Sequence, residues 1–247
     1  MIVNAHMHLG DCRVFDLNVT EEELLHSMDA NKVDVSVVQP FPGASDAAAV
    51  HKRIWDLAKR HPGRIYGMAS VNPHLPKPTY VDEVTRSVES YGFVAVKLHT
   101  IGHAVTPLGT DATTVFETAA RLGIAVMVHT GMGLPFAAPS LVIPRAQEYS
   151  DLPIILGHAG FVISTMDAYA AAKTCGNLYL EPSWCMKEAI GWLIQDLGPG
   201  RVMLGSDLPT NTHVELEKVR GLGLPAEAQE AVLGGTAARV FRLSGRS

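Results

Sequence analysis

A net basic charge, paired cysteines and long apolar runs are all missing from this sequence of 247 residues. Its formal charge is −5 and no stripe of Lys and Arg stands out, so we expect no nucleic-acid partner and no anionic membrane surface. The three cysteines, Cys12, Cys175 and Cys185, have no paired spacing, which argues against a disulfide framework and a cysteine zinc site. No segment approaches the roughly 18 apolar residues of a membrane span, and the opening residues lack a charged leader. We therefore expect a cytoplasmic protein with reduced cysteines.

The composition predicts a folded globular chain. Apolar residues make up 47% and charged residues 18%, which is ordinary for a protein with a packed core. No Pro-, Gly- or Ser-rich linker divides the chain, and α/β barrels of about this length form one domain. We predict a single domain over residues 1–247.

Short β-branched runs recur along the chain, each followed by a turn and a longer stretch of helical periodicity. The predicted strands are Met1–His6, Val33–Gln39, Ile65–Val71, Phe93–His99, Ile124–His129, Ile154–His158, Leu178–Glu181 and Val202–Ser206. The predicted helices are Thr20–Asn31, Ala47–Arg60, Tyr80–Tyr91, Asp111–Leu122, Ser164–Thr174, Lys187–Asp196, Val214–Gly221 and Ala226–Phe241. Such alternation indicates right-handed βαβ units, and eight of them predict a (β/α)8 TIM barrel. An open doubly wound sheet is the alternative, but it usually has a Gly-rich turn after the first strand, where this chain has His6-Met7-His8.

Polar residues gather at the carboxyl ends of the predicted strands, where the active sites of such barrels form. They are His6, His8, Lys97, His99, His129, His158, Glu181 and Asp207. Side chains two apart on a strand point the same way, so His6 and His8 could bind one ion only if they lie on a strand. The His-x-His spacing is weak alone. Its combination with His129, His158 and Asp207 predicts a divalent-metal site at the rim of the barrel, the alternative being a polar network without metal.

Six short segments carry a resemblance to a known family. They are Asn4–His8, Gly67–Pro73, Gly92–His99, Val128–Gly131, Leu156–Gly160 and Leu204–Asp207. In this order the sequence resembles the amidohydrolase superfamily, specifically the amidohydrolase-related branch of TIM-barrel hydrolases and of non-oxidative decarboxylases of the aminocarboxymuconate-semialdehyde type. The chain departs from the pattern at Asn4, where Asp is common, and at Thr236, where the closing motif has Asn. Neither position is a proposed ligand.

The resemblance implies a role for each matching residue. It implies that His6, His8 and His129 bind the metal, and that His158 acts as an acid/base or carbonyl-orienting residue. Asp207 is implied as a ligand that also shuttles a proton from the metal-bound water. Asn4 lies on the same side of its strand as His6 and could orient that ligand by a hydrogen bond. The branch generally uses one metal, so we expect one divalent ion, with Zn²⁺ favoured and Mn²⁺ as the alternative.

Three further residues are candidate substrate contacts, each with an ordinary alternative. Lys97 could hold a substrate carboxylate or form a salt bridge, and in some superfamily members a carboxylated lysine on this strand bridges two metals. His99 could contact substrate or bond to a neighbouring loop. Glu181 could face the substrate or cap a loop.

The remaining candidates carry less weight. His74 could lie at the mouth of the barrel, Trp184 and Met186 could wall the pocket, and the position of His213 is open. We expect His26, His51 and His61 to lie on the surface, because they fall on predicted helices or helix ends.

Three functions remain open at this point. The first is a metal-dependent hydrolase of a small amide, lactone or ester, in which a metal-activated water attacks a carbonyl. The second is a non-oxidative decarboxylase with the same metal site, and the third is a catalytically silent barrel that binds a ligand. The expected partner is a small-molecule substrate, and a homodimer paired through helices is an open alternative. The sequence does not identify the substrate.

Overall fold

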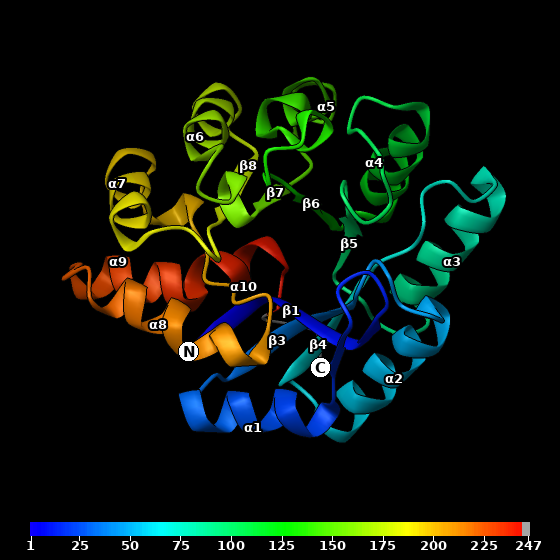
Figure 1. Ribbon diagram of the computed structural model, residues 1–247, viewed down its shortest axis with the longest axis horizontal. Helices are drawn as coiled ribbons and strands as arrows, with labels where there is room; N and C mark the ends of the chain where they lie inside the picture. Colours follow the sequence, from blue (N-terminus) through cyan, green and yellow to red (C-terminus); the bar gives the residue numbers. More distant parts are fainter. Residues whose placement is uncertain (244–247) are drawn as a thin grey trace.

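A curled sheet with helices packed around it organises the chain in the computed structural model, which describes residues 1–243 (Figure 1). The eight strands follow the order β2-β1-β3-β4-β5-β6-β7-β8. β2 pairs antiparallel with β1, and every other neighbouring pair is parallel. The strands are β1 Val3–Cys12, β2 Leu17–Val19, β3 Val35–Pro40, β4 Ile65–Ala69, β5 Ala95–Leu98, β6 Ala125–His129, β7 Ile154–Gly157 and β8 Leu178–Glu181.

Helices connect the parallel strands and cover the outside of the sheet (Figure 1). They are α1 Glu21–Asn31, α2 Ala47–Arg60, α3 Lys77–Glu89, α4 Thr110–Leu122, α5 Ile143–Glu148, α6 Thr165–Thr174, α7 Lys187–Leu197, α8 Thr212–Arg220, α9 Ala226–Glu230 and α10 Thr236–Val240. Local chemistry sets the starts of the first two. Thr20 and Glu23 form the capping box expected at α1, and the Asp46 side chain accepts from the Ala49 amide at the start of α2.

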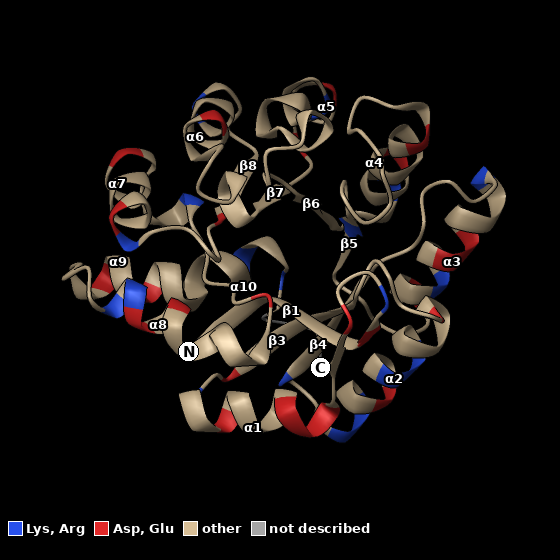
Figure 2. Cartoon of the chain, in the orientation of Figure 1, with Lys and Arg blue, Asp and Glu red and all other residues tan. Residues whose placement is uncertain are grey.

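The core has two parts because both faces of the sheet are covered. One apolar cluster fills the inside of the curl, with Val3, Ala5 and Met127 among its members, and α10 contributes Val240 to it. A larger cluster joins the outer face of the strands to the helices. This double burial explains the nearly continuous apolar strands. Charged residues are left mainly on the surrounding helices (Figure 2).

The segment predicted as the eighth strand, Val202–Ser206, is not a regular strand. It lies between β8 and β1 and makes isolated parallel bridges, Leu180 with Val202 and Met7 with Asp207. Its ladder is interrupted because the Leu204 amide donates to the Val232 carbonyl, outside the sheet. The regular closed barrel predicted from eight βα units is therefore found in part, as a curled α/β sheet.

Other predictions need correction. The first strand continues past His6 to Cys12 and turns back through β2, a hairpin that the sequence pattern did not reveal. The helix α5 was missed because it is only six residues long and follows two short 3-10 turns. The predicted helix Ala226–Phe241 is found as one continuous helical run, in which a π turn at Ala231–Gly235 joins α9 to α10.

His51 was predicted to lie on the surface and is instead buried on α2. Its Nε2 atom accepts a hydrogen bond from the Ser70 amide, and its ring meets the edge of Phe93. The fault in the prediction was to treat a helix as a surface element when the inner face of α2 packs on the sheet. Over residues 1–243, no helix is long and apolar enough to cross a membrane.

Candidate active site

Asp207 lies against the two histidines of β1. Its Oδ1 atom is 3.4 Å from His6 Nε2 and 3.3 Å from His8 Nε2. The backbone fixes this meeting, because the Asp207 amide donates to the His6 carbonyl and the His8 amide donates to the Asp207 carbonyl. Asp207 adopts a left-handed φ of 68°, a conformation that is uncommon for residues other than glycine. Such local strain is typical of positions held for function.

Asn4 joins β1 to the Asp207 segment. Its Oδ1 atom accepts from the His6 and Ser206 amides, and its Nδ2 atom donates to Ser206 Oγ. These bonds lie where the register between β1 and β3 shifts, between Asn4 and Met7. Asn4 thus supports His6 through the backbone.

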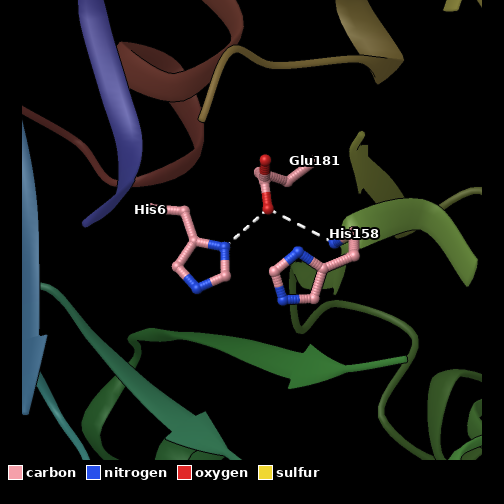
Figure 3. A group of neighbouring side chains, drawn as sticks. All are labelled: His6, His158 and Glu181. Atoms are coloured by element: carbon pink, nitrogen blue, oxygen red, sulfur yellow. Dashed lines mark hydrogen bonds and ion pairs between the residues drawn. The ribbon is translucent and has the colours of Figure 1, made fainter. Parts of the chain in front are cut away.

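Glu181 at the end of β8 holds His6 from the side away from Asp207. Its Oε2 atom is 2.6 Å from His6 Nδ1 and 3.3 Å from the His158 amide nitrogen (Figure 3). It also accepts from the amide and hydroxyl of Ser183. Because Glu181 accepts a hydrogen bond from the Nδ1–H group, the lone pair of His6 is left on Nε2, facing Asp207.

His8 presents the same nitrogen as His6. Its Nδ1 atom donates to the Pro40 carbonyl at 3.1 Å, which leaves the lone pair on Nε2, and its ring stacks on Phe41. The Gln39 amide lies 3.1 Å from that Nε2 atom. Two imidazole lone pairs and a carboxylate oxygen therefore converge, an arrangement that repels itself unless positive charge or donated protons lie among them.

Lys97 supplies part of that positive charge. It is buried on β5, with its Nζ atom 2.9 Å from His6 Nε2. Burial lowers the pKa of Lys97 to about 8, despite the neighbouring charges of Asp207 and Glu181. The sequence offered a substrate carboxylate or a salt bridge as its partner. The structure places its Nζ atom on His6.

His158 follows β7 in a strained turn. It has a φ of 65°, and Ala159, Phe161 and Val162 after it also have positive φ values. Its Nδ1 atom lies 2.8 Å from Ser183 Oγ, which in turn lies 3.1 Å from Glu181 Oε2. Since the carboxylate can only accept, Ser183 donates to Glu181 and accepts from His158 Nδ1, leaving the lone pair of His158 on Nε2.

His129 and His99 form the other side of the cluster. Their rings stack with centroids 4.3 Å apart, and the His129 ring meets the His158 ring edge-on at 4.7 Å. His99 Nδ1 accepts from the Gly102 amide. Both ring nitrogens of His129 are buried without a hydrogen-bond partner among residues 1–243. Buried polar atoms normally have a partner, so His129 is suited to an added ligand.

Burial determines the charge of these histidines. It lowers the pKa of His158 to about 3, and it holds the pKa values of His6, His99 and His129 well below their usual range. Burial alone would raise the pKa of Asp207, but the side-chain contact with His8 and the nearby His158 and His6 rings hold it well below its usual range. His6, His99, His129 and His158 are thus neutral, and Asp207 is ionised.

A cavity of about 420 Å³ opens onto this cluster. His8, His99, His129, His158 and Asp207 form its polar wall. Trp184 also lines the cavity, and its Nε1 atom donates to Asp207 Oδ2 at 3.0 Å. From the sequence, Trp184 was expected only to wall the pocket. Its pairing with Asp207 joins two separate loops, and such a contact leaves no local pattern in the sequence. Ser183 was missed for the same reason.

The lesser candidates lie elsewhere. His74 is exposed and bridges two loops, bonding to Asp111 Oδ2 and the His103 carbonyl. His213 lines a separate hollow beside α1. Met186 is exposed just before α7. Figure 3 places Glu181 between His6 and His158. Neither Glu181 nor Lys97 is among the described residues that line the cavity.

The donor set fits one divalent ion. Ligand atoms of His6, His8 and Asp207 lie within 4.8 Å of one another, and so do those of His6, His158 and Glu181. The first group suits an ion better, because Glu181 already accepts from four protein donors. Nitrogen and carboxylate donors of this kind are used by Zn²⁺ and Mn²⁺. An ion on His6 Nε2 would replace the contact with Lys97.

Comparison with known families identifies the family of this chain. A family model described as amidohydrolase matches residues 16–243. The chain belongs to the amidohydrolase family. No curated protein matches the sequence.

Solved structures of amidohydrolase-superfamily enzymes share the fold with this amidohydrolase chain. One is 5-carboxyvanillate decarboxylase from Novosphingobium aromaticivorans, complexed with manganese and a nitrobenzoic acid, at TM-score 0.78, 14% identity and coverage of 98% of this chain and 96% of that one. Another is 2,6-dihydroxybenzoate decarboxylase, at TM-score 0.78, 14% identity and 99% coverage of both chains. A third, from Pseudomonas putida, is assigned as a 2-pyrone-4,6-dicarboxylic acid hydrolase, at TM-score 0.75, 17% identity and 98% coverage of both chains.

Proposed function

We propose that this amidohydrolase is a metal-dependent hydrolase of a small ester, lactone or amide. The observation that carries the proposal is the pair of proton acceptors facing one cavity, the Asp207 carboxylate and the bare Nε2 atom of His158. Hydrolysis requires a base that takes a proton from water: the ionised Asp207 carboxylate can act as one, and His158 Nε2 can accept a hydrogen bond from the water or the substrate. We also propose that residues 202–207, which lie between β8 and β1, take the place of the eighth strand of a barrel.

Three residues would hold the metal, and the resemblance adds a fourth. His6, His8 and Asp207 offer converging donor atoms, and His129 offers two unpartnered ring nitrogens. One divalent ion, which we propose to be zinc, would polarise the substrate carbonyl and lower the pKa of water. The manganese in one structural relative makes Mn²⁺ the alternative.

The protein groups then divide the remaining work. Asp207 Oδ1 is held between two imidazoles. It accepts the proton of the attacking water and returns it to the leaving alkoxide or amine, while Trp184 fixes the other carboxylate oxygen. Ser183 and Glu181 hold the tautomer of His158, so that its Nε2 atom accepts a hydrogen bond from a substrate N–H or O–H or from the attacking water. Glu181 likewise holds the tautomer of His6.

Decarboxylation is the second candidate, because two of the structural relatives named above are decarboxylases. These relatives are named for aromatic acids, so a carboxylate-bearing substrate belongs to this alternative. Decarboxylation must deliver a proton to the substrate carbon. Only hydrolysis also removes a proton from an attacking water, and the ionised Asp207 carboxylate beside the proposed ligands favours it for that reason.

Isotope labelling separates the candidates. Hydrolysis in ¹⁸O-labelled water places one labelled oxygen in the product acid, whereas decarboxylation releases carbon dioxide without that label in the product. We expect labelled acid, formed only after Zn²⁺ or Mn²⁺ is supplied to chelator-treated protein. Release of carbon dioxide would replace the proposal with the second candidate. A protein that takes up neither metal and turns over no ester, lactone or amide would indicate the silent ligand-binding alternative.

A further inference from the structure

The cavity above the histidine cluster has a strongly uneven distribution of charge. Asp207 is its single acidic lining residue, and no Lys or Arg of residues 1–243 lines it. The buried Lys97 ammonium is directed at His6 Nε2. A substrate in this cavity therefore meets ionic chemistry at one end only, beside Asp207 and the histidines.

The rest of the cavity wall is apolar and rich in flat rings. Phe41, Phe161 and Trp184 contribute aromatic faces, and Leu134 and Met132 lie beside them. The Phe161 and Trp184 rings are nearly parallel, with an interplanar angle of 27°. Aromatic walls of this kind suit a planar apolar body. The volume of about 420 Å³ lies within the range of small-molecule pockets.

The mouth of the cavity is also apolar. Phe15 is 50% exposed, Met132 46% and Leu134 37%, and all three line the cavity. Charged residues lie mainly on the helices around the sheet (Figure 2). An anionic group on the part of the substrate that contacts this wall would thus lose its hydration without gaining a positive partner, which is unfavourable.

We propose that the substrate is an uncharged, planar or ring-shaped ester, lactone or amide that carries no free carboxylate. The inference rests on the proposed function, since hydrolysis sets which group reacts beside Asp207. The new element is the part of the substrate that lies away from the reacting group. Aromatic side chains line the cavity there, and no cation is among its described lining residues, so this part should be flat and uncharged.

A matched pair of methyl esters tests the inference. Methyl 4-carbamoylbenzoate and monomethyl terephthalate carry the same ester on the same ring, and differ by a neutral carboxamide against a carboxylate of similar shape. The purified enzyme, supplied with Zn²⁺, is assayed for methanol release, and the values of kcat/KM are compared after correction for the uncatalysed rates. We expect the carboxamide to be preferred by about 100-fold, because the carboxylate loses hydration without a partner.

Variants at the mouth provide the control. In Leu134→Arg a guanidinium reaches the distal end of the ring, so we expect the preference for the carboxamide to fall at least about tenfold. Leu134→Gln is polar but uncharged and should leave the ratio of the two kcat/KM values unchanged. Met132→Lys and Met132→Gln repeat the comparison at a second exposed position. Thermal melts show whether each variant folds.

The outcomes distinguish the two proposals. Equal or better hydrolysis of the carboxylate ester by the unmodified enzyme would overturn the inference and leave hydrolysis intact. If neither ester releases methanol, ester hydrolysis fails, and the inference is then read from dissociation constants measured by tryptophan fluorescence. Tighter binding of the carboxamide supports it, whereas tighter binding of the carboxylate, or binding of neither compound, overturns it.

Discussion

Glu181→Gln tests whether the buried carboxylate sets the metal-binding tautomer of His6. Glu181 accepts from His6 Nδ1, the His158 amide, and the amide and hydroxyl of Ser183. A glutamine has the same shape but replaces one acceptor oxygen with a donor NH₂ group. The loss of stability therefore depends on whether the NH₂ group takes the Oε1 or the Oε2 position.

The less costly orientation puts the NH₂ group at the Oε1 position, facing the Ser183 amide. That amide then faces a donor without a partner, which costs about 1–3 kcal/mol in the free energy of unfolding. His6 keeps its acceptor, but the acceptor is now neutral, and a charge-assisted hydrogen bond is about twice as strong as a neutral one. Weakening a hydrogen bond that orients a metal-binding histidine typically lowers metal affinity by about 10- to 100-fold.

Glu215→Gln is the matched control. Glu215 is also buried, and its Oε1 atom accepts from the Trp184 amide, Asn211 Nδ2 and Lys218 Nζ, with no contact to His6. All three donors meet the single oxygen Oε1, whose place the glutamine oxygen can take, so we expect a smaller loss of stability, from the loss of the negative charge alone, measured by guanidinium denaturation. Its affinity for Zn²⁺, measured by competition with a chromophoric chelator, should fall much less than that of Glu181→Gln, because Glu215 reaches the proposed ligands only indirectly, through the backbone of Trp184. The reasoning is refuted if Glu181→Gln binds Zn²⁺ as tightly as the unmodified protein, or if both variants lose affinity equally.

Three further predictions address the base, its partner and the buried histidines. Asp207→Asn should lower kcat by about 10²- to 10⁴-fold, since it removes the proton acceptor, and retained turnover would exclude Asp207 as the base. Trp184→Phe removes the indole hydrogen bond to Asp207 and should lower kcat/KM about tenfold, and an unchanged value would mean that this bond does not position the base. Burial lowers the pKa of His51 to about 4. Between pH 6.5 and 4 the imidazole is therefore protonated in the unfolded chain but not in the folded one, and up to about 3 kcal/mol of stability is lost as pH falls through that window. His51→Gln keeps an acceptor for the Ser70 amide and should flatten the pH dependence of denaturation, whereas an unchanged slope would show that His51 is not responsible.

Local pattern determined most of the elements. The capping box at Thr20 placed α1 to within one residue, and the β-branched runs ending at His129 and Glu181 matched β6 and β8 closely. The short helix α5 and the strand β2 escaped because six and three residues carry too little periodicity. The segment at Val202 looks like a strand in sequence, but Leu204 takes a hydrogen-bond partner from the π turn near the C-terminus.

The sequence by itself determined which chemical groups stand at the strand ends, because the spacing of His6 and His8 and the polar residue after each apolar run are local properties. Only the tertiary structure decided what each group does. It turned Glu181 toward His6, placed Lys97 on His6 Nε2 and brought Trp184 to Asp207. Those contacts join residues up to 175 positions apart. Tautomer and charge depend on the atoms within a few ångströms of a group, and the fold alone chooses those neighbours.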